Sequence, residues 1–315
     1  SGKSTFIKRF MESLVLPNIK EGYDRDRARD ELPQSAGGKT VMTTEPKFIP
    51  DAAVTVEMGE GERMRVKMID CVGYVVPDAL GTIEEGQPRM VRTPWQSDPM
   101  PFTAAAELGT KKVINEHSTI GILVSTDGSI GEIPRDSYVF AEERIVKELR
   151  AIGKPFAIVL NSAHPTDPQS IALGEELEEK YSAPVALVNC LELNGEDIKN
   201  ILQMILCEFP VTEVKVKLPE WMKALEPSHP VKRSISDSVC KCADEIRRAG
   251  DIKKGFSVLR ENDNVRDVIF ESVDYGCGRA VLSVVCTREL YFKTLCELTG
   301  FDISSEEQLV RMLRE

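Results

Sequence analysis

The segment Ser1-Gly2-Lys3-Ser4-Thr5-Phe6-Ile7-Lys8-Arg9-Phe10 decides the fold prediction. Its first five residues match the second half of the pattern G-x-x-x-x-G-K-[ST], in which backbone N–H groups surround phosphates, the lysine reaches the β- and γ-phosphates, and the hydroxyl binds Mg²⁺. We therefore predict phosphate contacts from Gly2, Lys3, Ser4 and Thr5, with Ser4 as a Mg²⁺ ligand. The first glycine of the pattern, and the strand that normally delivers the loop, are expected before residue 1.

A helix is expected directly after this loop. Phe6, Phe10 and Leu14 fall on or near one helical face, and Pro17 ends the run. The unpaired N–H groups and positive dipole end of such a helix attract phosphate. A second match, at residues 38–40 (Gly-Lys-Thr), lacks a preceding buried strand, and Pro46 blocks a long following helix. The sequence therefore favours the first loop as the phosphate site.

Composition limits the class of protein. The chain has 315 residues, 42% of them hydrophobic, which allows two domains with a core each. A net charge of −11 disfavours binding along a nucleic-acid backbone, which requires a basic surface. The eight cysteines are scattered, mostly in apolar runs, a usage typical of buried thiols in a reducing cytosol. No apolar stretch approaches membrane-spanning length. We expect a cytoplasmic protein with no nucleic-acid partner and no transmembrane segment.

The first 212 residues alternate strand-like and helix-like patterns. This alternation predicts an α/β domain with a mostly parallel sheet and helices on both faces. Strands are expected at 53–58, 64–70, 120–125, 156–161 and 185–189, and helices at 104–116, 137–152, 170–181 and 195–208. Residues 59–62 would form a hairpin connection, so one strand of the sheet should run antiparallel. The stretch 74–118 is long for a connection, which indicates a family-specific insertion.

The rest of the chain predicts a smaller domain. Prolines 219, 227 and 230 indicate a linker over residues 213–235. Residues 236–315 then predict a small α/β domain, with a helix from Ser236 to Ala249, a hairpin around residues 276–278 and two further helices. The last helix would begin with a capping box at Ser304 and Glu307.

The second candidate site element follows the strand at 64–70. Asp70 ends that strand, and Gly73 comes three residues later. An Asp at the carboxyl end of a core strand beside a phosphate loop holds Mg²⁺ through water, and the glycine amide reaches the γ-phosphate. Combined with the opening loop, this pattern predicts a P-loop NTPase with Asp70 as a Mg²⁺-binding acid and Gly73 as a nucleotide contact.

A loop rich in threonine lies between these two segments. Thr40, Thr43 and Thr44 fall within residues 36–46. In switch-type NTPases a loop threonine coordinates Mg²⁺ and positions the attacking water. We predict this role for Thr43 and Thr44, with the alternative that they begin a strand.

The choice of base follows from residues 161–164. Recognition of guanine normally requires Asn-Lys-x-Asp, and here the strand at 156–161 ends in Asn161-Ser162-Ala163-His164. Without the carboxylate, polar groups on guanine would be left unpaired, so discrimination for guanine is lost. We predict ATP as the nucleotide, with Asn161 as a retained contact. A plain loop position for His164 is favoured over contact with the base.

The source of the remaining catalytic groups is open. Tyr74 stands where small GTPases often have a water-orienting glutamine, so turnover is expected to be slow or completed by another group. Arg25, Arg27 and Arg29 are candidate cations for the transition state, but a solvated, charge-alternating loop is the simpler interpretation.

Three segments together, Ser1-to-Met11, Gly37-to-Pro46 and Met68-to-Tyr74, closely resemble the stage IV sporulation protein A family of endospore-forming bacteria. The resemblance covers the whole chain. It implies an ATPase related to translation-factor GTPases (the TRAFAC class), with Lys3 as the loop lysine, Thr43 and Thr44 as sensors and Asp70 as the Mg²⁺ acid.

The resemblance also implies a cellular role. Members of the family polymerise with ATP on the forespore surface in the mother cell, and form the basement layer of the spore coat with other coat proteins. A C-terminal region, not expected in this sequence, meets a small amphipathic membrane-bound sporulation peptide. The alternatives are a ribosome- or translation-associated GTPase and a nucleotide-binding scaffold without turnover.

Overall fold

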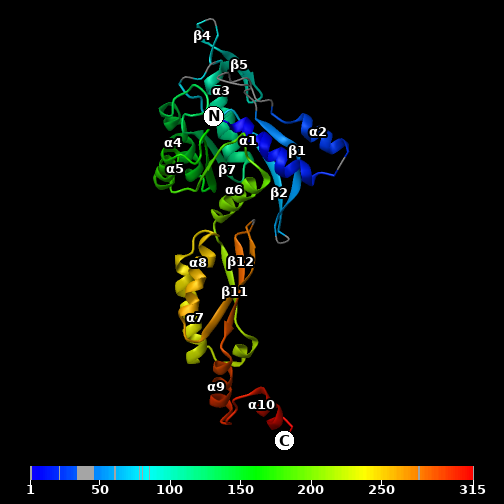
Figure 1. Cartoon of the computed structure of the whole chain (residues 1–315), viewed down its shortest axis with the longest axis vertical. Helices are drawn as coiled ribbons and strands as arrows, with labels where there is room; N and C mark the ends of the chain where they lie inside the picture. The colour runs from blue at the N-terminus through cyan, green and yellow to red at the C-terminus, as the bar shows by residue number, and fades with distance from the viewer. Residues whose placement is uncertain are drawn as a thin grey trace. The chain divides into compact units, whose positions relative to one another are not determined.

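The computed structural model describes residues 2–20, 22–33, 46–59, 62–77, 79, 81–84, 86–275 and 277–314. The chain divides into two compact units, Ser1–Ile205 and Leu206–Glu315. Both are drawn in Figure 1, the first in blue to green and the second in green to red. Each unit combines helices with strands, so the chain is a mixed α/β protein.

A parallel sheet forms the centre of the first unit. Strands β7 (Gly121–Thr126), β8 (Phe156–Asn161) and β9 (Val185–Val188) are hydrogen-bonded in that order, and both pairs are parallel. All six residues of β8 are buried. Because successive side chains of a strand point to opposite faces, the sheet is covered on both faces at its central strand. The parallel sheet expected from the apolar runs is confirmed.

Helices α4 (Asp136–Ala151) and α5 (Pro168–Tyr181) cover one face of this sheet (Figure 1). Their apolar side chains join alternate residues of β8 in one core cluster, which contains Val146, Leu149, Ile158, Leu160 and Leu177. Helix α3 (Phe102–Lys112) continues into a π-helical turn, η3 (Val113–His117), whose Ile114 belongs to the same cluster. Helix α6 spans Gly195–Cys207.

The first helix carries two fully buried aromatic residues, Phe6 and Phe10. Helix α1 (Lys3–Phe10) continues into the π-helical turn η1 (Met11–Val15) and the 3₁₀ turn η2 (Leu16–Asn18). Phe6 and Phe10 are 1% and 0% exposed, as their spacing predicted. Burial of this face fixes α1 in the core. The polar residues Lys3, Ser4 and Thr5 lie in the first turn of the helix.

The hairpin expected around residues 59–62 is present as β1 (Lys47–Gly59) and β2 (Glu62–Asp70). It differs from the prediction in forming a two-stranded sheet of its own, since among the described residues neither of its strands pairs with β7, β8 or β9. Helix α2 (Tyr23–Asp30), which has no apolar stripe and was not predicted, contacts β1. Arg27 Nη2 lies 2.8 Å from Asp51 Oδ2, so polar pairs hold this helix in place.

The insertion after Gly73 contains two small hairpins. Strands β3 (Ile83–Glu84) and β4 (Gln87–Pro88) pair antiparallel, as do β5 (Met90–Thr93) and β6 (Gln96–Pro101). Helix α3 follows β6 directly and contacts both β5 and β6. The insertion therefore leads the chain from the end of β2 onto α3.

The second unit has a mixed three-stranded sheet in the order β10-β12-β11. Strand β10 (Glu213–Lys217) is parallel to β12 (Arg279–Cys286), and β11 (Val265–Asp274) is antiparallel to β12. Its helical elements are η4 (Glu220–Ala224), α7 (Pro230–Glu245), α8 (Asp251–Ser257), η5 (Val258–Glu261), α9 (Arg288–Thr299) and α10 (Glu306–Met312). Ile235, Phe256 and Leu282 are fully buried in its core.

Three local expectations for this unit differ from the structure. Helix α7 begins at Pro230 rather than Ser236, because proline is compatible with the first helical turn. The range expected as a linker, 213–235, contains β10, η4 and the start of α7. The cap of α10 is Ser305, whose side chain accepts a hydrogen bond from Gln308 N, one residue later than the predicted box at Ser304.

No helix in the described part of the chain combines the length and the apolar character needed to cross a bilayer.

Candidate functional site

Gly2 forms the start of helix α1 in a conformation that favours glycine. Its φ is 101° and its ψ is 1°, and its carbonyl accepts the first helical hydrogen bond, from Phe6 N at 2.8 Å. A Cβ at this position would lie 2.3 Å from Asn161 Nδ2. The backbone before α1 therefore runs against the carboxyl end of β8, which only glycine permits.

Lys3 and Asp70 meet at this end of the helix. Lys3 Nζ lies 3.2 Å from Asp70 Oδ1, and the two side chains are 35% and 18% exposed. Asp70 Oδ1 is buried and accepts no hydrogen bond from a described residue, since the contact with Lys3 has the distance of an ion pair but not the geometry of a hydrogen bond. Residues 67 positions apart in sequence, the loop lysine and the acid at the end of β2, are thus neighbours.

Gly73, Ser4 and Thr5 complete the described part of the predicted site. Gly73 has a φ of 79°, and a Cβ there would meet nothing within 4 Å, so the backbone conformation rather than space requires glycine. Ser4 and Thr5 lie half-buried in the first turn of α1. Thr40, Thr43 and Thr44 lie outside the described residues, so their assigned role stays a prediction.

Asn161 connects three parts of the site. It is 3% exposed at the end of β8, and its Oδ1 accepts a hydrogen bond of 2.9 Å from Cys190 N, just beyond β9. Its Nδ2 faces Gly2. Asn161 therefore links the carboxyl ends of two strands to the start of α1, and its predicted contact with the nucleotide base stays a prediction.

Ser162 does not face an open site. It is 0% exposed, its hydroxyl lies 3.2 Å from Ser170 Oγ, and it accepts a hydrogen bond from His164 N at 2.9 Å. His164 itself is exposed. Where guanine-binding proteins have a lysine, this chain therefore has a small buried side chain that forms hydrogen bonds within the loop.

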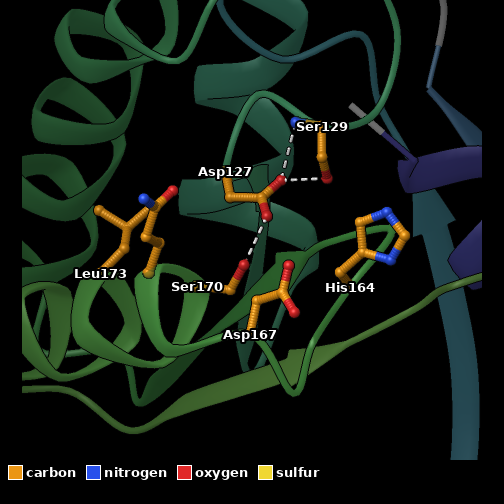
Figure 2. A pocket seen from close by; sticks show the side chains of 7 residues that line it. Asp127, Ser129, His164, Asp167, Ser170 and Leu173 are labelled. Atoms are coloured by element: carbon orange, nitrogen blue, oxygen red, sulfur yellow. Dashed lines mark hydrogen bonds between the residues drawn. The ribbon is translucent and has the colours of Figure 1, made fainter.

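A pocket of about 330 Å³ lies beside this loop, between the carboxyl ends of β7 and β8 and the start of α5 (Figure 2). Its polar lining was not predicted from the sequence. Asp127 Oδ1 accepts hydrogen bonds from Ser129 N (2.9 Å) and Ser129 Oγ (2.5 Å), and Oδ2 accepts one from Ser170 Oγ (2.9 Å). The remaining lining residues are His164, Asp167, Gln169 and Leu173.

Burial alone would raise the pKa of Asp127, but hydrogen bonds from serine hydroxyls and the Ser129 amide outweigh it and hold the pKa below its ordinary value. Asp127 is therefore ionised at neutral pH and fixes the loop after β7 to the start of α5. The Asp-Gly-Ser sequence at 127–129, which is typical of a turn, was the only signal of this arrangement.

Two sequence hypotheses concern groups near the phosphate. The Tyr74 hydroxyl donates a hydrogen bond to Glu148 of α4, so it is occupied by a protein partner. Arg27 pairs with Asp51 and with Glu31, whose Oε1 lies 3.2 Å from Arg27 Nε. These contacts favour the interpretation of Arg27 as part of a charge-paired surface.

The described residues fit a magnesium ion held together with phosphate. Mg²⁺ binds carboxylate and hydroxyl oxygens and keeps several water or phosphate ligands, so one or two protein groups suffice. Asp70 offers a buried carboxylate oxygen without a hydrogen-bond donor, and Ser4 offers a hydroxyl in the first turn of α1. Among the described residues there is no cluster of three or more His, Cys, Asp or Glu side chains suited to an all-protein metal cage.

Comparison with known proteins assigns both units to one family. Residues 1–210 match the family model described as stage IV sporulation protein A, ATPase domain, and residues 211–315 match the model of the middle domain of the same protein. No solved structure matches the chain.

Individual relatives agree with this assignment. The chain is 44% identical over 313 residues to stage IV sporulation protein A of Bacillus anthracis, which covers 99% of the chain. It is 43% identical over 315 residues to the protein of that name from Bacillus subtilis (strain 168), and 43% over 313 residues to that from Clostridioides difficile (strain 630). The chain spans 64% of the length of each of these relatives. It belongs to the stage IV sporulation protein A family.

Proposed function

We propose that residues 1–210 form a Mg²⁺-dependent ATPase domain with a P-loop NTPase fold of the translation-factor (TRAFAC) class, and that it acts in spore formation. The observation that carries the proposal is the contact of Lys3 with Asp70 at the start of α1, at 3.2 Å. A loop lysine and a strand-end acid brought together beside the N-terminus of a helix suit a triphosphate and its metal.

Each residue has a defined task in this proposal. Lys3 exchanges its contact with Asp70 for the β- and γ-phosphates, while the N–H groups of residues 2–5 surround them. Ser4, Asp70 and the threonines at 43 and 44 would hold a magnesium ion and its water, which would supply charge neutralisation for the transferred phosphoryl group. Gly73 offers its amide to the γ-phosphate from a backbone conformation that glycine adopts readily.

Adenine is the base that the loop after β8 suits best. Ser162 is buried and hydrogen-bonded within the protein, and residue 164 is a histidine rather than a carboxylate. Guanine bound here would lack the acceptor for its ring N–H and exocyclic amine, at a cost of about 1–3 kcal/mol for each unpaired group. This argument favours ATP over GTP.

Hydrolysis would drive assembly of the protein into the basement layer of the spore coat, on the forespore surface in the mother cell. Two loops held by the γ-phosphate are released when it leaves, and the released shape pairs with a neighbouring copy. Contacts that do not close into a ring then give a filament or sheet. Further partners would be other coat proteins and, through a region outside this chain, a small amphipathic membrane-bound peptide.

A comparison of lysine variants tests nucleotide binding. In the full-length protein, Lys3→Ala should abolish phosphate release and weaken ATP affinity at least tenfold, as expected for loss of a charge-assisted contact. Lys8→Ala removes an equivalent charge five residues further along α1, where Lys8 Nζ lies 3.9 Å from Glu12, and should leave both unchanged. Competition between ATP and GTP in the same assay tests the base. Binding that is unaffected by Lys3→Ala, or stronger for GTP, would contradict the proposal.

The order of hydrolysis and assembly has its own test. Asp70→Asn should retain nucleotide but lose turnover, and should not form polymer in sedimentation or electron microscopy with ATP. Polymer formed by this variant as readily as by the unmodified protein, without phosphate release, would mean that hydrolysis does not precede assembly.

A further inference from the structure

Tyr74 directly follows Gly73 and is anchored to helix α4. Its side chain is 8% exposed, and its hydroxyl donates a hydrogen bond to Glu148 Oε2. The guanidinium carbon of Arg144 lies 4.0 Å from the centre of the Tyr74 ring, within the range of a cation–π contact. One face and the tip of the ring are thus both held by α4.

Arg144 extends this contact to a second helix. Its Nη1 and Nη2 donate to the two carboxylate oxygens of Glu107 on α3, at 2.9 and 2.8 Å, and its Nε lies 3.7 Å from Glu148 Oε1. A bidentate pair of this kind fixes the plane of the guanidinium group, and therefore the surface on which the Tyr74 ring rests. We call Tyr74, Arg144, Glu148 and Glu107 the tyrosine anchor.

The anchor keeps the tyrosine neutral. Burial, followed by the hydrogen bond to Glu148, raises the pKa of Tyr74 far above its ordinary value, and the bond from Arg144 holds the pKa of Glu107 below its ordinary value. The hydroxyl is therefore protonated near neutral pH and donates to Glu148. Its hydrogen is not available to a water molecule at the phosphate.

The position of the anchor in the chain gives it a consequence for Gly73. The segment 71–73 is fixed at one side by Asp70, the last residue of β2, and at the other side by Tyr74. Gly73 itself has a φ of 79°, and no described atom beyond its chain neighbours lies within 4 Å of where a Cβ would be, so packing on that side does not hold it. The two flanking attachments set the direction of its peptide group.

We propose that Tyr74 is a positioning residue, which holds the Gly73 amide toward the γ-phosphate by attaching the segment after β2 to α4 and, through Arg144, to α3. The inference depends on the proposed ATPase function. It also gives a role to the residue that replaces a water-orienting glutamine: Tyr74 acts on Gly73 and not on the water. A change in the Gly73 peptide when phosphate leaves is transmitted to α3 and α4 by the same contacts.

The test separates the hydroxyl from the ring. In the full-length protein, Tyr74→Phe retains the ring on Arg144 and removes only the bond to Glu148. Because Gly73 would contact only the γ-phosphate in the proposed site, the ratio of ATP to ADP affinity should fall about tenfold, with ADP affinity changed less than twofold, and kcat should fall about tenfold. A general loss of structure would instead weaken ATP and ADP binding together.

Glutamate variants supply the matched comparison. Glu148→Ala removes the same bond and, in addition, the 3.7 Å contact with Arg144, so its effect should be at least that of Tyr74→Phe, and the double variant should be no worse than Glu148→Ala alone. Glu148→Gln retains an oxygen acceptor and should restore most of the ratio. Glu143→Gln makes the same change on α4 at a carboxylate that pairs with Lys180 at 2.7 Å, and should have no effect.

A readout without nucleotide distinguishes failure of this inference from failure of the proposed function. Amide hydrogen exchange of residues 71–77 in the nucleotide-free protein should accelerate about tenfold in Tyr74→Phe and not in Glu143→Gln. Unchanged exchange, or an unchanged ATP-to-ADP ratio in a protein that still hydrolyses ATP, would overturn the positioning role. Accelerated exchange in a protein that binds no ATP would retain the anchor as a structural contact, and would refute both the ATPase function and the positioning role.

Discussion

Replacement of Gly2 by alanine should disable the phosphate loop more than the size of the change suggests. The new Cβ would lie 2.3 Å from Asn161 Nδ2, whereas ordinary contacts begin near 3.4 Å, so the loop or the asparagine must move by about 1 Å. Asn161 is 3% exposed and bonded to Cys190 N, which leaves the loop to move. A displacement of about 1 Å in a binding group costs on the order of 10²-fold. The left-handed φ of 101° adds about 1–2 kcal/mol of strain.

The assay is ATP affinity of the full-length protein, by calorimetry or by a fluorescent analogue, with the melting temperature measured in parallel. We expect Gly2→Ala to lose about 100-fold in affinity. Gly153→Ala is the control, because Gly153 has a φ of 66° and nothing within 4 Å of an added Cβ, so it carries backbone strain without a clash. It should lower stability by about 1 kcal/mol and leave affinity unchanged. Affinity of Gly2→Ala within threefold of the unmodified protein would refute the reasoning.

Three further outcomes are expected. The pKa of Asp127 is lowered in the folded protein, so the ionised carboxylate stabilises the fold above the unfolded pKa of about 3.9, and this contribution is lost as the pH falls through the folded pKa. Asp127→Asn or Ser170→Ala should therefore lose less stability than the unmodified protein in acid titrations below about pH 4. Phe256 is 0% exposed, so Phe256→Ala should lower the free energy of unfolding of the second unit by about 3–5 kcal/mol, measured through hydrogen exchange of β12. A decrease of less than about 1 kcal/mol would contradict its place in the core. Burial raises the pKa of Cys190 to about 12, so in the native protein at pH 8 iodoacetamide should modify exposed Cys277 and not Cys190, as mass spectrometry would detect.

Long apolar runs made the sheet of the first unit predictable. Strand β8 was expected at 156–161 and has those bounds, because a strand buried on both faces is a continuous apolar run with a polar residue at its end. Lys3 and Asp70 were assigned to one site from two separate motifs, and they lie 3.2 Å apart, while the roles assigned to them stay predictions. A pattern that involves many residues, such as the apolar run of β8, was therefore enough to predict the bounds of that strand.

Elements held by tertiary contacts could not be predicted. Helix α2 buries only Ala28 and depends on pairs such as Arg27 with Asp51, which no local pattern reveals. The bond from Tyr74 to Glu148 joins residues 74 positions apart in sequence. The start of α7 was missed because Pro230 can either end a linker or open a helix, and packing against the second core decides between them.

The placement of Asn161 separates two properties that share one short loop. Its amide faces the beginning of α1 and the backbone beyond β9, while position 164, three residues along, is exposed. In the proposed ATPase, Asn161 would support the phosphate loop from inside the protein, while the exposed loop beyond it would be free to differ. A substitution at residue 164 would therefore leave the packing of Asn161 against Gly2 intact, so the exposed surface of this loop can diverge without disturbing the start of α1.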